Sequence, residues 1–119
     1  MLTNFIFVGI GGAIGAILRY GINELFERYL NSSATIPILF INILGCFLIG
    51  LLLGSSMPSK DASYYFFIIG FLGSFTTMSA VTHQTILIAN TNLIYGVSYI
   101  MLTVLATIVA TYLGTLITK

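Results

Sequence analysis

The sequence predicts an all-α membrane protein with four transmembrane helices. Hydrophobic residues make up 58% of the 119-residue chain and charged residues only 6%, whereas roughly a quarter of the residues of a soluble domain are charged. A helical span needs about 20 mostly apolar residues, so the chain has room for four spans and little else. We therefore expect one membrane domain over residues 1–119, multi-pass in the cell membrane, with spans over about 5–26, 37–53, 64–89 and 93–117.

The first expected span carries a face of small residues followed by one cation. Gly9, Gly11, Gly12 and Gly15 would let a neighbouring helix approach closely. Arg19 follows after an apolar stretch too short to cross the membrane, so its charge lies within the span or near its end. Two interpretations remain open: a side chain that reaches back to the membrane surface, or a positive charge near the entrance of an anion path.

The second expected span is apolar apart from one amide. Pro37 suits the first turn of a helix, where a backbone N–H is not needed, and Asn42 is the only strongly polar side chain that follows. An amide offers two N–H donors and one oxygen acceptor. Asn42 is therefore either a hydrogen-bonding partner for another helix or a ligand for an anion.

The third expected span contains the most unusual stretch, which reads GFLGSFTTMSAVTHQT over residues 70–85. Its polar groups lie at membrane depth, where they need partners within the protein and usually face a bundle interior or a water-filled path. Gly70 and Gly73, followed by the β-branched pair Thr76 and Thr77, favour a helix that is broken at its centre. Such breaks hold ions or line cavities, whereas the plainer alternative is hydrogen bonding between packed helices.

The fourth expected span repeats a hydroxyl group at every fourth residue. The series is Tyr99, Thr103, Thr107 and Thr111, and this spacing places the side chains along one face of a helix. A lone threonine in a membrane helix usually donates to the carbonyl four residues earlier. A regular series is also what an ion-lining track would require, so both interpretations stay open.

The polar residues of the chain do not suggest an enzyme. The sequence offers no serine–histidine–acid set, metal-ligand cluster or phosphate loop, and His83 has no Asp, Glu or Cys partner within the expected spans. The net charge of +1 gives no basic surface for nucleic acid. Neutral donors without carboxylates suit a small anion that has lost its water, because a cation path would more often show acidic rings or converging carbonyls.

Three motifs in this order resemble those of the Fluc (CrcB) family of bacterial fluoride channels. They are GGAIGAILRY at 11–20, FINILG at 40–45 and GFLGSFTT at 70–77. The resemblance implies a fluoride-selective channel subunit that exports fluoride and lowers its concentration in the cytoplasm. It also implies an inverted (antiparallel) dimer of four-helix subunits with two narrow anion pores.

The same resemblance assigns roles to individual residues. A structural sodium ion at the dimer interface would be held by the backbone carbonyls of Gly73 and Thr76, and Arg19 would lie in the anion vestibule. The partners implied are fluoride, sodium, membrane lipid and a homologous subunit. The fluoride pathway would include Asn42, Ser79, Tyr99, Thr103 and Thr107.

The chain departs from the family pattern in the third span. The family signature continues Thr-Thr-Phe-Ser-Thr-Phe, whereas this chain has Met78 and Val81 at the two ring positions and Gln84 where a family glutamate follows. The edge of an aromatic ring carries partial positive charge and can face an anion, which neither a thioether nor an isopropyl group can do. We therefore expect a heterodimer with a paralogue that keeps both phenylalanines, with a homodimer as the alternative.

Two further functions are compatible with a short four-span chain. The loss of both rings allows a non-conducting subunit that only assembles with a partner. A small multidrug transporter-like exporter would need a membrane-embedded glutamate in its first span, and Glu24 and Glu27 lie at the end of that span instead. Fluoride flux and proton-coupled export of a quaternary amine distinguish these functions.

Overall fold

The computed structural model describes residues 1–30, 35–55 and 61–119, and all regular structure within them is helical. Four helical spans in this part of the chain are long and apolar enough to cross a membrane, which confirms the predicted all-α chain with four membrane-spanning helices. The third span is made of three consecutive segments. In order, the elements are α1 (Leu2–Tyr29), α2 (Thr35–Ser55), η1 (Tyr64–Leu72), α3 (Gly73–Phe75), α4 (Met78–Thr91) and α5 (Leu93–Thr118).

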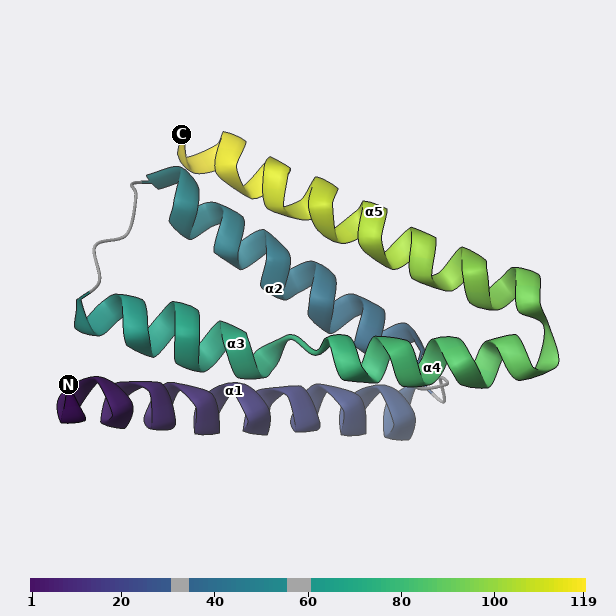
Figure 1. Ribbon diagram of the computed structural model, residues 1–119, viewed down its shortest axis with the longest axis horizontal. Helices are drawn as coiled ribbons and strands as arrows, with labels where there is room; N and C mark the ends of the chain where they lie inside the picture. The colour runs from purple at the N-terminus through teal and green to yellow at the C-terminus, as the bar shows by residue number, and fades with distance from the viewer. Residues whose placement is uncertain (31–34, 56–60) are drawn as a thin grey trace.

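The helices form two layers that meet along the third span. In Figure 1, α1 runs beside η1 and α3 along the lower edge of the view, and α2 runs beside α5 above them. The N- and C-termini lie at the same end of the molecule. The longest dimension is 46 Å, close to the thickness of about 40–45 Å of a bilayer with its headgroups.

Glycines let α1 approach η1 to backbone distance. A Cβ atom added at Gly11 would overlap the carbonyl oxygen of Phe66, and one added at Gly15 would overlap that of Phe71. From the other side, a Cβ at Gly70 would come within 2.6 Å of the Val8 carbonyl oxygen. Small residues are therefore required on both surfaces of this contact, as is common where membrane helices pack closely.

A glycine also lets α2 and α5 pack closely, and threonine hydroxyls form hydrogen bonds between the two helices. A Cβ added at Gly114 would lie 2.5 Å from the Phe47 carbonyl oxygen. Thr111 Oγ1 donates to the carbonyl oxygen of Cys46 at 3.0 Å, and Thr118 Oγ1 donates to that of Leu51 at 2.8 Å. Close backbones and interhelical hydrogen bonds are the interactions available inside a membrane, where the hydrophobic effect does not bring helices together.

Substitution of Gly15 by alanine is expected to destabilise the protein by about 1–3 kcal/mol, because the added methyl group meets a backbone carbonyl that cannot move aside. The matched control is Gly21→Ala on the same helix, since a Cβ there would meet nothing within 4 Å. Alanine is also the better helix former, so this control should be neutral or slightly stabilised. Thermal unfolding of both variants in one detergent checks the pair, and equal melting temperatures would contradict the close contact.

Candidate functional site

The third span loses its helical hydrogen bonding between α3 and α4. Thr76 and Thr77 are extended there, with φ −82°, ψ 156° and φ −152°, ψ 114°, and the ribbon narrows to a strand-like link at this point (Figure 1). In an uninterrupted helix the Thr77 N–H would donate to the carbonyl of Gly73, four residues earlier. It donates instead to Asn42 Oδ1 at 2.8 Å. The carbonyl of Gly73 therefore lacks its usual helical donor.

Asn42 of α2 binds both backbone groups of Thr77. Besides accepting from the Thr77 N–H, its Nδ2 donates to the Thr77 carbonyl oxygen at 3.1 Å. The residue is 6% exposed, so the pair lies inside the protein. Of the two interpretations of Asn42, the interhelical hydrogen bond is thus present, and the second N–H of Nδ2 remains to serve an anion.

Two helix ends of opposite polarity meet at these extended residues. The carbonyls that end α3 carry partial negative charge and the N–H groups that start α4 carry partial positive charge. Some of them have partners: the Leu72 carbonyl accepts from Thr76 N at 3.1 Å and from Thr76 Oγ1 at 3.0 Å. At the start of α4, Thr77 Oγ1 accepts from Ala80 N at 3.2 Å as an N-cap. The α3 end suits a cation and the α4 end suits an anion.

A cavity of about 180 Å³ opens beside this junction, between α2, α4 and α5. It brings together most of the residues that the sequence assigns to an anion path, and the described residues that line it include no Asp, Glu, Lys or Arg. Its lining is Asn42, Cys46, Thr76, Thr77, Met78, Val81, Thr103, Val104 and Thr107.

The remaining predicted site residues lie outside the lining of this cavity. Tyr99 is buried against Val81, and its hydroxyl donates to the Thr35 carbonyl oxygen at 3.3 Å. Ser79 is exposed, with its Oγ 3.1 Å from Thr77 Oγ1. Gly73 is also exposed. Arg19 reaches the third span from α1 and donates from Nε to a backbone carbonyl there, that of Ser74, at 3.1 Å.

The threonines of α5 direct their hydroxyl protons along their own helix. Thr103 Oγ1 donates to the Tyr99 carbonyl at 2.8 Å, and Thr107 Oγ1 donates to the Thr103 carbonyl at 2.7 Å. This is the usual arrangement of a threonine in a helix. Helical carbonyls already have backbone donors, so turning one hydroxyl toward an anion costs only about 1 kcal/mol, the net value of an ordinary hydrogen bond. The hydroxyls of Thr103 and Thr107 can therefore donate to an anion, although in this structure they donate to carbonyls of their own helix.

The two ring positions have different environments. Met78 is 59% exposed, whereas Val81 is 1% exposed and packs with Ile38 and Tyr99. Both line the cavity, and neither supplies an aromatic edge.

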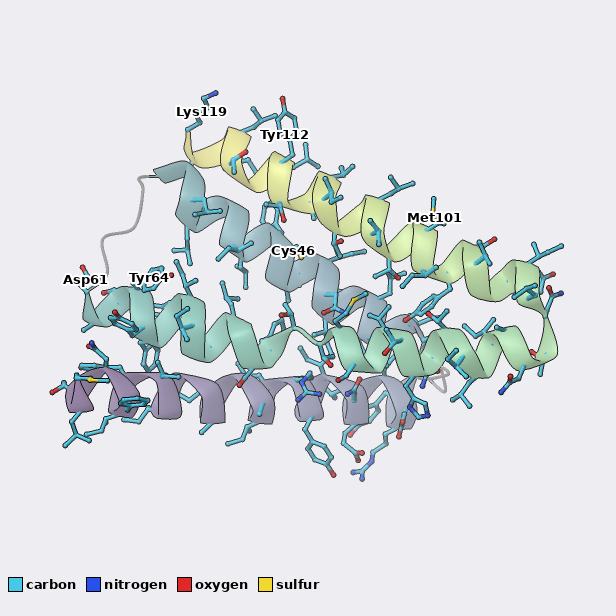
Figure 2. The ribbon with its side chains drawn as sticks, in the orientation of Figure 1. Cys46, Asp61, Tyr64, Met101, Tyr112 and Lys119 are labelled. Carbon is cyan, nitrogen blue, oxygen red and sulfur yellow. The ribbon has the colours of Figure 1, made fainter. Side chains whose placement is uncertain are left out.

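Two polar residues, Cys46 beside the site and Asn23 on α1, were not predicted from the sequence. Cys46 lines this cavity and a neighbouring one of about 420 Å³, and Figure 2 shows it near the middle of α2. Its position four residues after Asn42 places both on one helix face, which is the signal that could have identified it. Asn23, four residues after Arg19 on α1, has a buried Oδ1 that accepts no hydrogen bond within the described part of the chain. A polar residue one turn after the arginine was the corresponding signal.

Comparison with known proteins finds one matching family and a set of similar proteins that share one name. A family model described as "CrcB-like protein, Camphor Resistance (CrcB)" matches residues 6–115. Three similar proteins are each named "Fluoride-specific ion channel FluC". The one from Azobacteroides pseudotrichonymphae is 33% identical over 100% of this chain and 98% of its own. Those from Campylobacter jejuni and Haemophilus ducreyi are 38% and 36% identical, covering 100% and 99% of this chain and 100% and 94% of the relatives.

Proposed function

The chain belongs to the CrcB family, and from that membership we propose that it is a fluoride-selective ion channel subunit that exports fluoride from the cytoplasm. It is a multi-pass membrane protein and not an enzyme. The observation that carries the proposal is the similarity over nearly the whole chain to proteins named as fluoride channels. The cavity beside Asn42 adds independent physical support.

That cavity offers what a small anion needs when it leaves water. Fluoride is a strong hydrogen-bond acceptor, so neutral donors can replace its hydration without the cost of burying a second charge. The remaining N–H of Asn42 and the hydroxyls of Thr103 and Thr107 are such donors. The positive end of α4 begins at Met78, on the cavity wall, and half-helix ends at membrane depth favour anions in this way.

The test is fluoride efflux from liposomes that contain the purified protein, followed with a fluoride electrode and with chloride as the control anion. We expect fluoride efflux that exceeds chloride efflux in an assembly that contains this chain. Absence of fluoride efflux from every such assembly would instead support a non-conducting assembly subunit. The exporter alternative is not favoured, since Glu24 is 42% exposed at its side chain and lies 3.9 Å from Arg28.

The proposal extends to assembly as an inverted dimer, in which a second subunit covers the open side of the cavity. The support is the exposure of polar groups at membrane depth: Ser79 and Gly73 are both exposed in the single subunit. Polar groups in such a position need cover from protein. Because Met78 and Val81 supply no ring, a paralogue with phenylalanine at both positions would complete one pore, and the second pore would be degenerate.

A structural sodium ion at the dimer interface is the remaining part of the proposal. The residues fit such an ion, because the break in hydrogen bonding leaves the Gly73 carbonyl without its helical donor and unwound carbonyls are known sodium ligands. Gly73 and Thr76 from two inverted copies would supply four carbonyl oxygens. A bound monovalent cation would also raise the local potential for an anion.

Replacement of sodium by N-methylglucamine at constant ionic strength is expected to lower both the thermal stability of the dimer and its fluoride efflux. A ligand present at 100 times its dissociation constant stabilises the folded state by about 2.7 kcal/mol. Thermal unfolding in the two salts measures this difference. Equal melting temperatures and equal efflux after complete replacement would argue against a bound sodium ion.

A further inference from the structure

Arg19 of α1 contacts the third span where its first half ends. Its Nε donates to the carbonyl oxygen of Ser74 at 3.1 Å in a partly buried position. In an uninterrupted helix that carbonyl would accept from the N–H of Met78, four residues later. The extended conformation of Thr76 and Thr77 removes this donor. The Arg19 guanidinium therefore supplies the donor that the interrupted helix does not provide.

The close contact between α1 and the third span brings Arg19 to this position. A Cβ added at Gly15, one turn before Arg19, would overlap the Phe71 carbonyl, and one added at Gly12 would lie 3.2 Å from Ser74 Oγ. An arginine that only reached for the membrane surface would direct its head group away from the protein. Here the head group turns inward, to the backbone of a neighbouring helix.

The other cation of the same helix shows the contrast. The side chain of Arg28 is 72% exposed and lies 3.9 Å from Glu24 in an ordinary surface pair, which contributes little to stability. Arg19 is half-buried and bonds a carbonyl at a helix C-terminus, where a positive charge is favoured. The two arginines therefore differ in role although they share one helix.

We propose that Arg19 is a positioning residue that fixes the Ser74 peptide at the end of α3. Asn42 of α2 fixes Thr77 from the other side, so two different helices hold the two ends of the extended segment. The Gly73 carbonyl belongs to the peptide next to the one that Arg19 fixes, and its orientation depends on this bond. The consequence for fluoride flux rests on the proposed function, whereas the bond itself does not.

Three substitutions at position 19 separate the hydrogen bond from the charge. Counting bonds from Cα, the amide nitrogen of glutamine takes the place of arginine Nε, whereas lysine has a methylene there and methionine a methyl group. Arg19→Gln keeps the donor without the charge, Arg19→Lys keeps a charge without that donor, and Arg19→Met keeps neither. Arg28→Met is the control for loss of an exposed charge from α1.

The readout is the Ser74 carbonyl itself, observed by solid-state NMR of the full chain in lipid bilayers. Ser74–Phe75 is the only Ser–Phe pair in the sequence, so carbonyl-¹³C serine combined with ¹⁵N phenylalanine gives a single selected resonance. We expect this resonance to move in Arg19→Met and Arg19→Lys, and to stay near its original position in Arg19→Gln and Arg28→Met. An unchanged resonance in Arg19→Met would overturn the proposal, whether or not the protein conducts fluoride.

Fluoride efflux from the same variants, each co-expressed with the ring-bearing paralogue, gives the second readout. We expect Arg19→Gln to stay within about threefold of the unmodified chain. Arg19→Met and Arg19→Lys should lose about tenfold to a hundredfold, as expected for a hydrogen bond to a charged group. A vestibule charge would give the opposite order, with Lys active and Gln inactive, and its effect would weaken with ionic strength. That order would overturn the positioning role and leave the fluoride channel intact.

Discussion

In the conducting assembly of this chain with its paralogue, replacement of Asn42 by leucine is expected to reduce fluoride efflux by about a hundredfold or more. Leucine has the same branching and the same number of side-chain heavy atoms but removes both partners of Thr77, whose N–H and carbonyl groups are bound at 2.8 and 3.1 Å. Leaving each buried backbone group unpaired costs about 1–3 kcal/mol. The chain can recover one bond by returning the Thr77 N–H to the Gly73 carbonyl, which would close the helix and remove the extended segment.

Asn42→Asp keeps the oxygen acceptor of the side chain and removes its N–H donors. The carboxylate still accepts from the Thr77 N–H, but it cannot donate to the Thr77 carbonyl and it places a negative charge on the wall of an anion path. Efflux should therefore fall in this variant as well. The control is Asn90→Leu, because Asn90 is exposed at the end of α4. Efflux measured for all three variants in liposomes decides the matter, and unimpaired efflux from Asn42→Asp would remove Asn42 from the pathway.

The second large effect is expected from restoring the rings. The unmodified chain alone should pass little fluoride, whereas Met78→Phe combined with Val81→Phe should conduct as a homodimer. Met78 is 59% exposed, so the subunit's own residues leave room for a ring there, but Val81 is 1% exposed. A ring at position 81 must therefore extend into the 180 Å³ cavity that Val81 lines, which is where an aromatic edge would meet an anion.

The matched control changes the same two positions without adding aromatic edges. Met78→Leu combined with Val81→Leu should leave efflux low, and co-expression of the unmodified chain with a ring-bearing paralogue should raise it. Efflux is measured from each chain purified alone and from the pair. Robust efflux from the unmodified chain alone would defeat the heterodimer proposal, and equal gains in the phenylalanine and leucine variants would defeat the ring argument.

The sequence predicted the fold because the constraints on a membrane chain are local. Apolar runs long enough for a span, separated by short polar segments, leave few alternatives. Helix ends follow from single residues: Asn92 separates α4 from α5 because its Oδ1 accepts from Ile94 N at 3.0 Å and Tyr95 N at 3.3 Å. Each span extends beyond its expected limits by no more than three residues at either end.

The candidate site was predictable only in part. Four-residue spacing places Thr103 and Thr107 on one face of α5, and both line the cavity with Asn42. Spacing does not reveal that Asn42 forms hydrogen bonds with Thr77, 35 residues away. Nor does it reveal that Arg19 donates to the carbonyl of Ser74, 55 residues away. These bonds depend on how closely α1 and α2 pack against the third span, which is a property of the assembled helices.

The position of the two termini limits how a dimer of this chain can be engineered. Both termini lie at one end of the molecule (Figure 1), so in an inverted pair the termini of the two subunits emerge on opposite faces of the bilayer. A flexible polar linker cannot join the C-terminus of one subunit to the N-terminus of the other in that arrangement. A single-chain tandem would require an additional membrane-crossing helix of about 20 apolar residues as its linker. The same geometry would place fusion tags on the two subunits in different aqueous compartments.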